Sequence, residues 1–563
     1  MKTIKSIFAL AMATLFCSGA FAQNVTEKIQ ELSKKAEKGY FYNAYQDEET
    51  GNIEITYKFK TKSKDNMGTY ETYIFDKNLN LVKQEEFSSL KKDIEDKADY
   101  TSTIVWSRIG GCTSFDILNT ALHLYKQTYS YTWNKEKKDF MYKKTEDIEI
   151  KPKNADNKSY SGYASFTDYN TGNLMVLTSS TTKNPDKTTS KDFVLLDVRV
   201  DLSVKEIPLP INASQLVYCG VIPTNNTECA PNSTDIQNGD MFFVFAPTFS
   251  KASSTDYKVY SYLRVDNKGN IKENFKINCP SPNLILTGFT TDKDGALYFC
   301  GSYNNLPKIF DQLYKEYSPL ANPCFPDGDK NLRMAQYEAK TEKLKMDYFC
   351  ILKLKDNKME WIKSNLMADI TKAMKTPQGQ KKSVPYSGNR LQIQYFNLLN
   401  NGDIFISGQL KGKVKLGESM KDAYKNVISL QFNPNGEIKA QYSISTLSIA
   451  DKLNTIFEMP QNFIFSADGQ TLYWNLLETK TIKGYANFFD AYNGAPTFYP
   501  NYYPSMVKIN LTSNNIEEYN VFGSRKYLLN KNSPYIYNEK EKTIYYIGSD
   551  KGSKLWLGKY MMK

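Results

Sequence analysis

Short runs of alternating hydrophobic and polar residues recur along the chain, and seven of them begin at a tight turn. One run reads Asn401-Gly-Asp-Ile-Phe-Ile-Ser-Gly408. Alternation with a period of two is typical of β-strands. The other six runs begin at Gly51, Gly172, Gly239, Gly295, Gly469 and Lys542. Such repeats indicate units that bury their apolar faces only against neighbouring units, as blades do.

The runs group into units of four strands joined by turn residues that tolerate a left-handed backbone. Six segments fit this plan: 40–87, 160–210, 214–277, 283–362, 391–444 and 461–522. Segment 100–150 fits less well and offers a strand pair at 122–133 and 140–150. The last two runs, 543–547 and 555–561, could close a ring with an N-terminal strand. We therefore expect an all-β fold, a β-propeller of seven or eight four-stranded antiparallel blades with short helical insertions, and favour eight.

Two segments carry apolar residues at helical spacing instead. Val25, Ile29, Leu32 and Ala36 predict an N-terminal helical lead over residues 23–39, before a propeller at 40–563. Leu306, Ile309, Phe310, Leu313 and Tyr314 predict a helix within 303–346 that packs against the scaffold.

The first 22 residues have the features of a secretory signal peptide. Lys2 and Lys5 precede an apolar stretch, and Ala20-Phe-Ala22 is a small-residue cleavage site. No later stretch approaches the ~20 apolar residues that a membrane helix needs. We expect an exported protein without a transmembrane segment, located in the periplasm or at the cell surface.

Seven cysteines follow the signal peptide, and an odd number in an oxidising compartment leaves at least one thiol unpaired. Cys219 and Cys229 flank a turn-rich loop, and Cys300 and Cys350 end two strands expected side by side. These are the two candidate disulfides, with buried unbridged thiols as the alternative.

The net charge of +11 comes mostly from lysine, since only six of the 72 basic residues are arginine. Nucleic-acid readers favour the planar, bidentate guanidinium. Lysines on exposed strand faces explain the charge, and we expect no nucleic-acid partner.

One repeat resembles a known family. Phe463-Ile-Phe-Ser-Ala-Asp-Gly-Gln-Thr-Leu-Tyr-Trp474 is similar to the Ser-Pro-Asp-Gly-x-x-Leu-Tyr core of WD40-like repeats in TolB-type exported propellers, with Ala467 in place of the proline. The resemblance implies a propeller and protein contacts in the periplasm. The motif is structural and implies no chemistry.

Motifs for common catalytic chemistry are missing from the sequence. His123, the one histidine, lies on an expected strand, and no Gly-x-Ser-x-Gly elbow accompanies it. The chain has no Cys-x-x-Cys pair, and Asp292, Asp294 and Gly295 are better explained by a hairpin turn than by a calcium loop. We expect no metal, no cofactor and no catalytic residue.

Long connections gather on one face of the expected propeller, at 303–346, 364–390, 411–424 and 479–504. Long insertions are usually functional, and tyrosine and phenylalanine supply rigid contact area for proteins and sugar rings. The aromatic residues of the last connection are therefore the candidate partner-binding residues, unless they plug the ring: Tyr485, Phe488, Phe489, Tyr492, Phe498, Tyr499, Tyr502 and Tyr503.

The sequence favours a non-enzymatic propeller that binds a protein or a cell-envelope partner through its long-loop face. The alternative is a carbohydrate-active or glycan-binding propeller that uses carboxylates and aromatic residues near the central channel. A third reading is a scaffold for an assembly. Convergent carboxylates with raised pKa would favour an enzyme, and an exposed aromatic patch without them would favour a binding protein.

Overall fold

The computed structural model describes most of the chain between residues 25 and 562. The described ranges are 25–59, 68–89, 99–109, 122–134, 139–152, 157–168, 170–212, 216–223, 239–246, 259–281, 284–304, 345–377, 384–389, 391–416, 419–449, 460–485, 497–530, 533–550 and 554–562.

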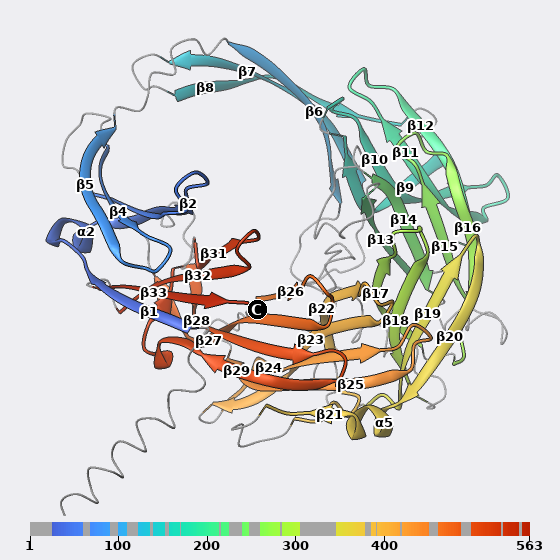
Figure 1. Ribbon diagram of the computed structural model, residues 1–563. Helices are drawn as coiled ribbons and strands as arrows, with labels where there is room; N and C mark the ends of the chain where they lie inside the picture. Colours follow the sequence, from blue (N-terminus) through green and yellow to red (C-terminus); the bar gives the residue numbers. More distant parts are fainter. Residues whose placement is uncertain are drawn as a thin grey trace, which may run out of the picture.

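Eight β-sheets form a ring, numbered here blades 1 to 8 in chain order (Figure 1). Blade 1 contains β2 (Tyr40–Gln46), β3 (Ile53–Lys58), β4 (Gly68–Phe75) and β5 (Leu81–Ser89). Blade 2 contains β6 (Tyr100–Ile109), β7 (Leu122–Asn134) and β8 (Asp139–Ile150). Blade 3 contains β9 (Lys158–Thr167), β10 (Leu174–Lys183), β11 (Thr189–Val198) and β12 (Val204–Asn212). Blade 4 contains β13 (Leu216–Pro223), β14 (Gly239–Ala246), β15 (Val259–Val265) and β16 (Ile271–Asn278).

The second half of the ring follows the same antiparallel plan. Blade 5 contains β17 (Ile285–Thr291), β18 (Leu297–Tyr303), β19 (Tyr348–Lys355) and β20 (Lys358–Leu366). Blade 6 contains β22 (Leu391–Leu398), β23 (Ile404–Leu416), β24 (Ser419–Phe432), β25 (Ile438–Ile449) and a short parallel strand, β21 (Met374–Lys375). Blade 7 contains β26 (Gln461–Phe465), β27 (Thr471–Tyr485), β28 (Thr497–Asn510) and β29 (Asn515–Val521). Blade 8 contains β1 (Val25–Glu31), β30 (Leu528–Leu529), β31 (Tyr535–Asn538), β32 (Thr543–Ser549) and β33 (Lys554–Met561).

Short helices accompany the strands: α2 (Lys34–Lys38), α5 (Met367–Lys372) and the 3₁₀ helix η4 (Phe522–Arg525). The all-β propeller is therefore confirmed, and the expected copies correspond to blades. The helix expected within 303–346 lies outside the described residues.

The N-terminal segment closes the ring as a strand, so the helix predicted over its apolar residues is wrong. β1 pairs antiparallel with β33, with Val25 opposite Tyr560. Glu27 strengthens this closure, because its carboxylate accepts hydrogen bonds from Trp556 Nε1 at 3.0 Å and from the Gly523 amide at 3.1 Å. The open edge of β33 offers this segment a full ladder of backbone hydrogen bonds, which overrides its weak helical pattern. Only α2 remains helical.

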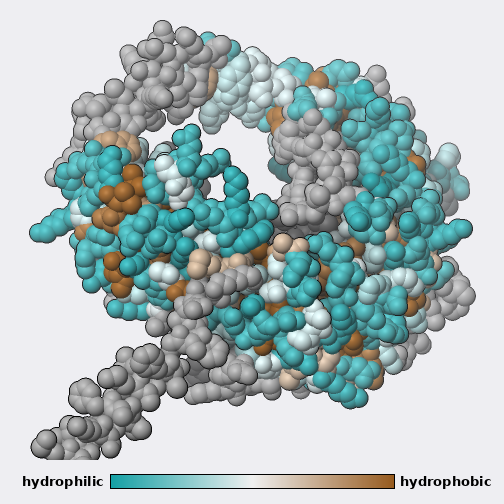
Figure 2. Space-filling view, in the orientation of Figure 1, coloured by the Kyte–Doolittle hydropathy of each residue, from teal (hydrophilic) through white to brown (hydrophobic). Residues whose placement is uncertain are grey.

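Hydrophobic clusters join neighbouring blades around most of the ring. They span blades 2 and 3, 3 and 4, 4 to 6, 6 and 7, 7 and 8, and 8 and 1. None of these clusters of described residues joins blade 1 to blade 2. In Figure 1, β7 and β8 extend from blade 3 across the top toward blade 1, and Figure 2 shows the opening that the ring encloses. The junction between blades 1 and 2 thus differs from the others.

The described parts of three connections expected to be long loops are strand and packed chain, which corrects the prediction for those parts, while residues 305–344 of the fourth connection lie outside the described residues. Residues 411–424 belong mostly to the β23–β24 hairpin, and residues 479–504 mostly to the β27–β28 hairpin. The connection 364–390 includes α5 and β21, and its Ile370 is buried in the core. These hairpins extend beyond their neighbours, because each additional residue pair continues the same hydrogen-bond ladder.

The disulfide predicted between Cys300 and Cys350 does not form; both are buried free thiols. Cys350 lies opposite Gly301 in the β18–β19 ladder. Because successive side chains alternate between the faces of a sheet, Cys300 and Cys350 point to opposite faces of blade 5. Burial raises the pKa of both thiols. The pairing of Cys219 with Cys229 stays a prediction, since Cys229 lies outside the described residues.

Candidate binding site

Exposed aromatic side chains gather on two neighbouring blades. Six aromatic residues among the described ones are strongly exposed, and all lie on blades 1 and 2: Tyr40, Tyr42, Tyr45, Phe87, Tyr100 and Tyr142. Figure 2 shows brown, hydrophobic surface over blade 1 at the left, where Leu81 and Val82 are exposed besides Phe87. Clustered exposed aromatic rings mark contact surfaces more often than single ones do.

On blade 1 these rings lie on the face turned away from blade 8. Ile53, Ile55 and Tyr73 bury the opposite face against blade 8. On the exposed face, Tyr42 contacts Tyr70 edge to face at 5.1 Å, and Tyr70 stacks on Phe87 at 5.4 Å. We call Tyr42, Tyr70 and Phe87 the blade 1 aromatic face.

Cationic and acidic groups accompany the blade 1 aromatic face. Lys58 Nζ lies 5.9 Å from the ring centre of Tyr42 and 5.4 Å from that of Tyr70. The Tyr45 hydroxyl donates to Glu54 at 2.5 Å, and this hydrogen bond to a carboxylate raises the pKa of Tyr45 to about 12. The face therefore combines rings with polar groups that can bind a partner.

Among the described residues, blade 2 packs against another blade through one face only. Val105, Leu124 and Ile150 pack against blade 3, and the Val105 amide donates to Gly172 O at 3.3 Å. Since β7 side chains alternate, its odd-numbered residues lie on the other face. This face carries the set that we call the aromatic strip: Tyr100, Trp106, Tyr125, Tyr129, Tyr131, Trp133, Phe140 and Tyr142.

The rings of the aromatic strip contact one another along its length. Tyr100 stacks on Tyr131 at 4.5 Å with planes 5° apart, and Trp106 stacks on Tyr125 at 4.7 Å. Phe140 meets Trp133 edge to face at 5.1 Å. These contacts preorganise the rings, which lowers the ordering cost of binding.

Polar side chains alternate with these rings. The Tyr129 hydroxyl donates to Gln127 Oε1, and Gln127 Nε2 donates to Asp147, each at 2.9 Å. His123 Nδ1 lies 3.4 Å from Glu149 Oε1 on the same face. His123 is thus a surface group next to one carboxylate.

Of the eight aromatic residues predicted to bind a partner, only Tyr502 and Tyr503 have described side chains, and both lie on blade 7, away from this site. Tyr503 is buried, and its hydroxyl donates to Glu478 at 2.7 Å, so this residue was wrongly assigned to the surface. Tyr502 packs, partly buried, against the cluster between blades 7 and 8. Tyr485, Phe498 and Tyr499 lie in β27 and β28, but their side chains are outside the described part of the chain. Phe488, Phe489 and Tyr492 are outside it altogether.

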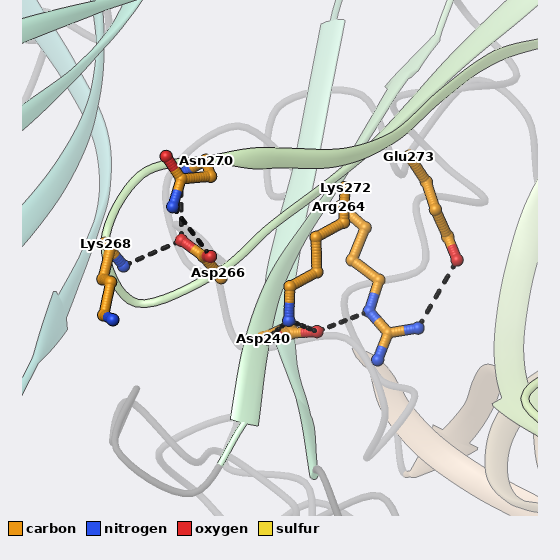
Figure 3. Close-up of polar contacts among 7 residues, drawn as sticks. All are labelled: Asp240, Arg264, Asp266, Lys268, Asn270, Lys272 and Glu273. Atoms are coloured by element: carbon orange, nitrogen blue, oxygen red, sulfur yellow. Dashed lines mark hydrogen bonds and ion pairs between the residues drawn. The ribbon is translucent and has the colours of Figure 1, made fainter.

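Described carboxylates serve mainly structural roles. Asp240, which is buried, accepts from Arg264 Nε at 2.8 Å and from Lys272 Nζ at 3.2 Å (Figure 3). Asp403 has the same place in blade 6, where Lys439 donates to it at 2.7 Å. Lys272 sits in a β-bulge of β16, and Lys439 in a β-bulge of β25. The bulge turns the lysine toward the aspartate at the start of the second strand of the blade.

Hairpin aspartates act in a similar way. The carboxylate of Asp266 accepts backbone hydrogen bonds from Lys268 and Asn270, each at 2.9 Å (Figure 3). Burial alone would raise the pKa of Asp266, but the hydrogen bonds from Asn270 outweigh it and lower that pKa. Wherever the pKa of a described carboxylate departs from its ordinary value, it is lowered. None of these carboxylates has the raised pKa expected of a general acid. They are Asp47, Asp76, Glu146, Asp147, Asp186, Asp201, Glu206, Asp266, Glu437, Asp468 and Glu517.

The described ranges of the chain contain no group of three or more His, Cys, Asp or Glu side chains that could hold a metal ion. Within the same ranges, no helix is long and apolar enough to cross a membrane.

A sequence signal for the aromatic strip does exist. Tyr129, Tyr131 and Trp133 alternate along one run, in the segment that fitted the blade plan poorly. Alternating aromatic residues on a strand of a thin sheet predict one aromatic face. The signal was missed because a blade is expected to bury both faces.

Comparisons with known proteins do not assign this chain to a family. The chain matches no known family model, and no curated protein matches it in sequence. A puromycin hydrolase structure is 8% identical with a TM-score of 0.26; the match covers 92% of this chain and 60% of that one. A Penicillium chrysogenum alpha-L-arabinanase complexed with arabinobiose is 9% identical with a TM-score of 0.25, covering 71% and 93%. The chain thus spans less than two thirds of the hydrolase, and similarity at this level carries no argument about function.

Proposed function

We propose that this protein is an exported, non-enzymatic propeller that binds a partner in the cell envelope. In this proposal the contact is made by the blade 1 aromatic face and the aromatic strip of blade 2. The observation that carries the proposal is that all six strongly exposed aromatic residues of the described chain lie on these two blades. The remaining blades bury their aromatic rings between neighbours.

The energetics of exposure support this reading. Leaving an aromatic side chain in water forgoes roughly 1.5–3 kcal/mol of burial free energy. Tyr142 is 69% exposed and Tyr42 is 50% exposed. Tyrosine is favoured at interfaces because it joins a large apolar ring to a polar end. A partner that covers these rings recovers the burial free energy that folding leaves unused.

Cosedimentation with cell-envelope fragments of the producing organism tests the proposal. We expect the intact chain to sediment with the fragments, and the double variant Tyr42→Ala with Tyr142→Ala to bind at least tenfold more weakly. Leu366→Ala, an exposed residue on blade 5, is the matched control and should bind normally.

Two results would contradict the proposal. One is that the double tyrosine variant sediments with the fragments as well as the intact chain does. The other is that neither the intact chain nor any variant sediments with them. If a chain shortened between 479 and 504 alone lost binding, the surface would instead be the one predicted from the sequence.

A further inference from the structure

The aromatic strip has the dimensions of a chain ligand. From Tyr125 to Trp133 it spans eight residue steps of β7, which at ~3.3 Å per residue is about 26 Å. Its three strands at ~4.8 Å spacing give a width of about 14 Å. The resulting area, on the order of 400 Å², is about half of the ~800 Å² that each partner contributes to a standard protein interface. A long, narrow strip fits an extended chain better than a globular partner.

The chemistry of the strip is aromatic and polar with little aliphatic surface. Ile104 is the one aliphatic residue that the described register places on this face. Rings offer flat apolar surface to C–H groups, while Gln127, Asp147 and Glu149 offer planar hydrogen-bonding groups between them. A ligand that alternates C–H faces with hydroxyl groups matches this arrangement.

Charges on the strip balance. Arg108 and Lys144 share this face with Asp147 and Glu149, and Lys144 forms an ion pair with Asp147. Proteins that hold single-stranded nucleic acids combine aromatic rings with a positively charged groove, which these paired charges do not provide. The same balance gives no advantage to an anionic polysaccharide. The strip therefore favours an uncharged ligand.

From shape, chemistry and charge together, we propose that the aromatic strip of blade 2 binds an uncharged, extended glycan chain. Sugar rings stack on the exposed aromatic side chains, and their hydroxyl groups hydrogen-bond to Gln127 and to the carboxylates beside it. This inference rests on the proposed function, since it names the partner class for one of the two aromatic surfaces.

Calorimetric titration of the full mature chain with defined oligosaccharides tests the inference. The probes are neutral hexasaccharides of glucose, mannose, galactose and xylose, with their disaccharides for length. We expect at least one hexasaccharide to bind more tightly than its disaccharide. The double variant Tyr131→Ala with Trp133→Ala should weaken this binding at least tenfold. Met141→Ala should leave it unchanged, because Met141 is exposed on the opposite face of the same sheet.

Several outcomes would overturn the glycan inference. The inference is wrong if no neutral probe binds, or if the double variant binds a hexasaccharide as tightly as the intact chain does. It is also wrong if only a galacturonate hexasaccharide or an oligothymidylate binds. If the double variant does not fold, Tyr142→Ala replaces it, since that ring is the most exposed of the strip.

The two proposals can fail separately. If no glycan binds, but the intact chain sediments with envelope fragments and the Tyr42→Ala, Tyr142→Ala variant does not, the glycan inference is wrong and the proposed function stands. If neither glycan nor envelope fragments bind, both are wrong.

Discussion

Single residues show why the same short sequence recurs in distant blades. Asp240 and Asp403 each follow a glycine and lie at the start of the second strand of a blade. Each is buried and accepts a hydrogen bond from a lysine in a bulge, Lys272 of β16 and Lys439 of β25. Local sequence indicates the strand, but the partners of these aspartates lie 24 to 36 residues away, which spacing along the chain cannot reveal.

Replacing Asp240 with asparagine should destabilise the protein by about 2 kcal/mol. The change removes the shorter of the two carboxylate contacts of the partly buried Arg264 guanidinium and leaves only its contact to Glu273 at 3.5 Å. Breaking a buried pair costs more than an exposed pair is worth. Denaturant unfolding measures the effect. Asp403→Asn should behave alike, and the exposed Lys372–Asp369 pair gives the control, since Asp369→Asn should change stability by less than about 0.5 kcal/mol. Equal effects at Asp240 and Asp369 would refute this account.

Exposed turn aspartates should make stability fall in acid. A hydrogen bond from the Ser466 hydroxyl, at 2.5 Å, lowers the pKa of Asp468. A lowered folded-state pKa contributes stability above the unfolded value, about 3.9, and this contribution is lost as pH falls through the folded value. Thermal midpoints measured between pH 6 and pH 2 should therefore fall less steeply in Asp468→Asn than in the parent chain. Parallel curves for the two proteins would contradict the assignment.

Elements show where non-local pairing overrides the local pattern. Residues 25–31 have apolar residues at helical spacing but form the strand that closes the ring. The segment 479–504 was predicted to be an aromatic loop, but its described residues, 479–485 and 497–504, extend the β27–β28 ladder. In both cases the conformation depends on a neighbouring strand that offers free backbone hydrogen-bonding groups. The sequence of the segment alone does not identify that neighbouring strand.

Removing the carboxylate of Glu27 should weaken ring closure. Glu27→Ala leaves the Trp556 indole N–H and the Gly523 amide without their acceptor, at a cost of about 1–3 kcal/mol for each group left unsatisfied. The neighbouring Glu31→Ala, which removes an exposed pair with Lys554, should cost less than about 1 kcal/mol. Thermal or denaturant unfolding of the two variants distinguishes them. Similar losses in both would show that Glu27 has no special role in closure.

The whole molecule is unevenly packed. Each of blades 3 to 8 packs against both of its neighbours through hydrophobic clusters of described residues, whereas blade 1 packs only toward blade 8 and blade 2 only toward blade 3. Regions with few buried apolar contacts open more readily than well-packed ones. The aromatic strip therefore lies on one of the two least supported sheets of the ring.

Hydrogen exchange should reveal this asymmetry. Amides of β7 and β8 should exchange faster than those of β18 and β19, whose side chains are almost all buried. Peptide-resolved exchange followed by mass spectrometry gives the comparison. Binding of a ligand to the aromatic strip should slow exchange in β7 and leave β19 unchanged. Equal protection of the two sheets without ligand would argue against an uneven ring.

The sequence by itself determined most of the strands, their turns and a repeat of seven or eight blades, because alternation and turn chemistry act between neighbours along the chain. It also indicated an aromatic binding surface, but assigned it to a connection in which Tyr503 is buried. Tertiary structure decided which strand closes the ring, which faces Cys300 and Cys350 occupy, and which aromatic rings stay exposed. Those outcomes depend on which sheet packs against which, and only the non-local partners of each strand settle that.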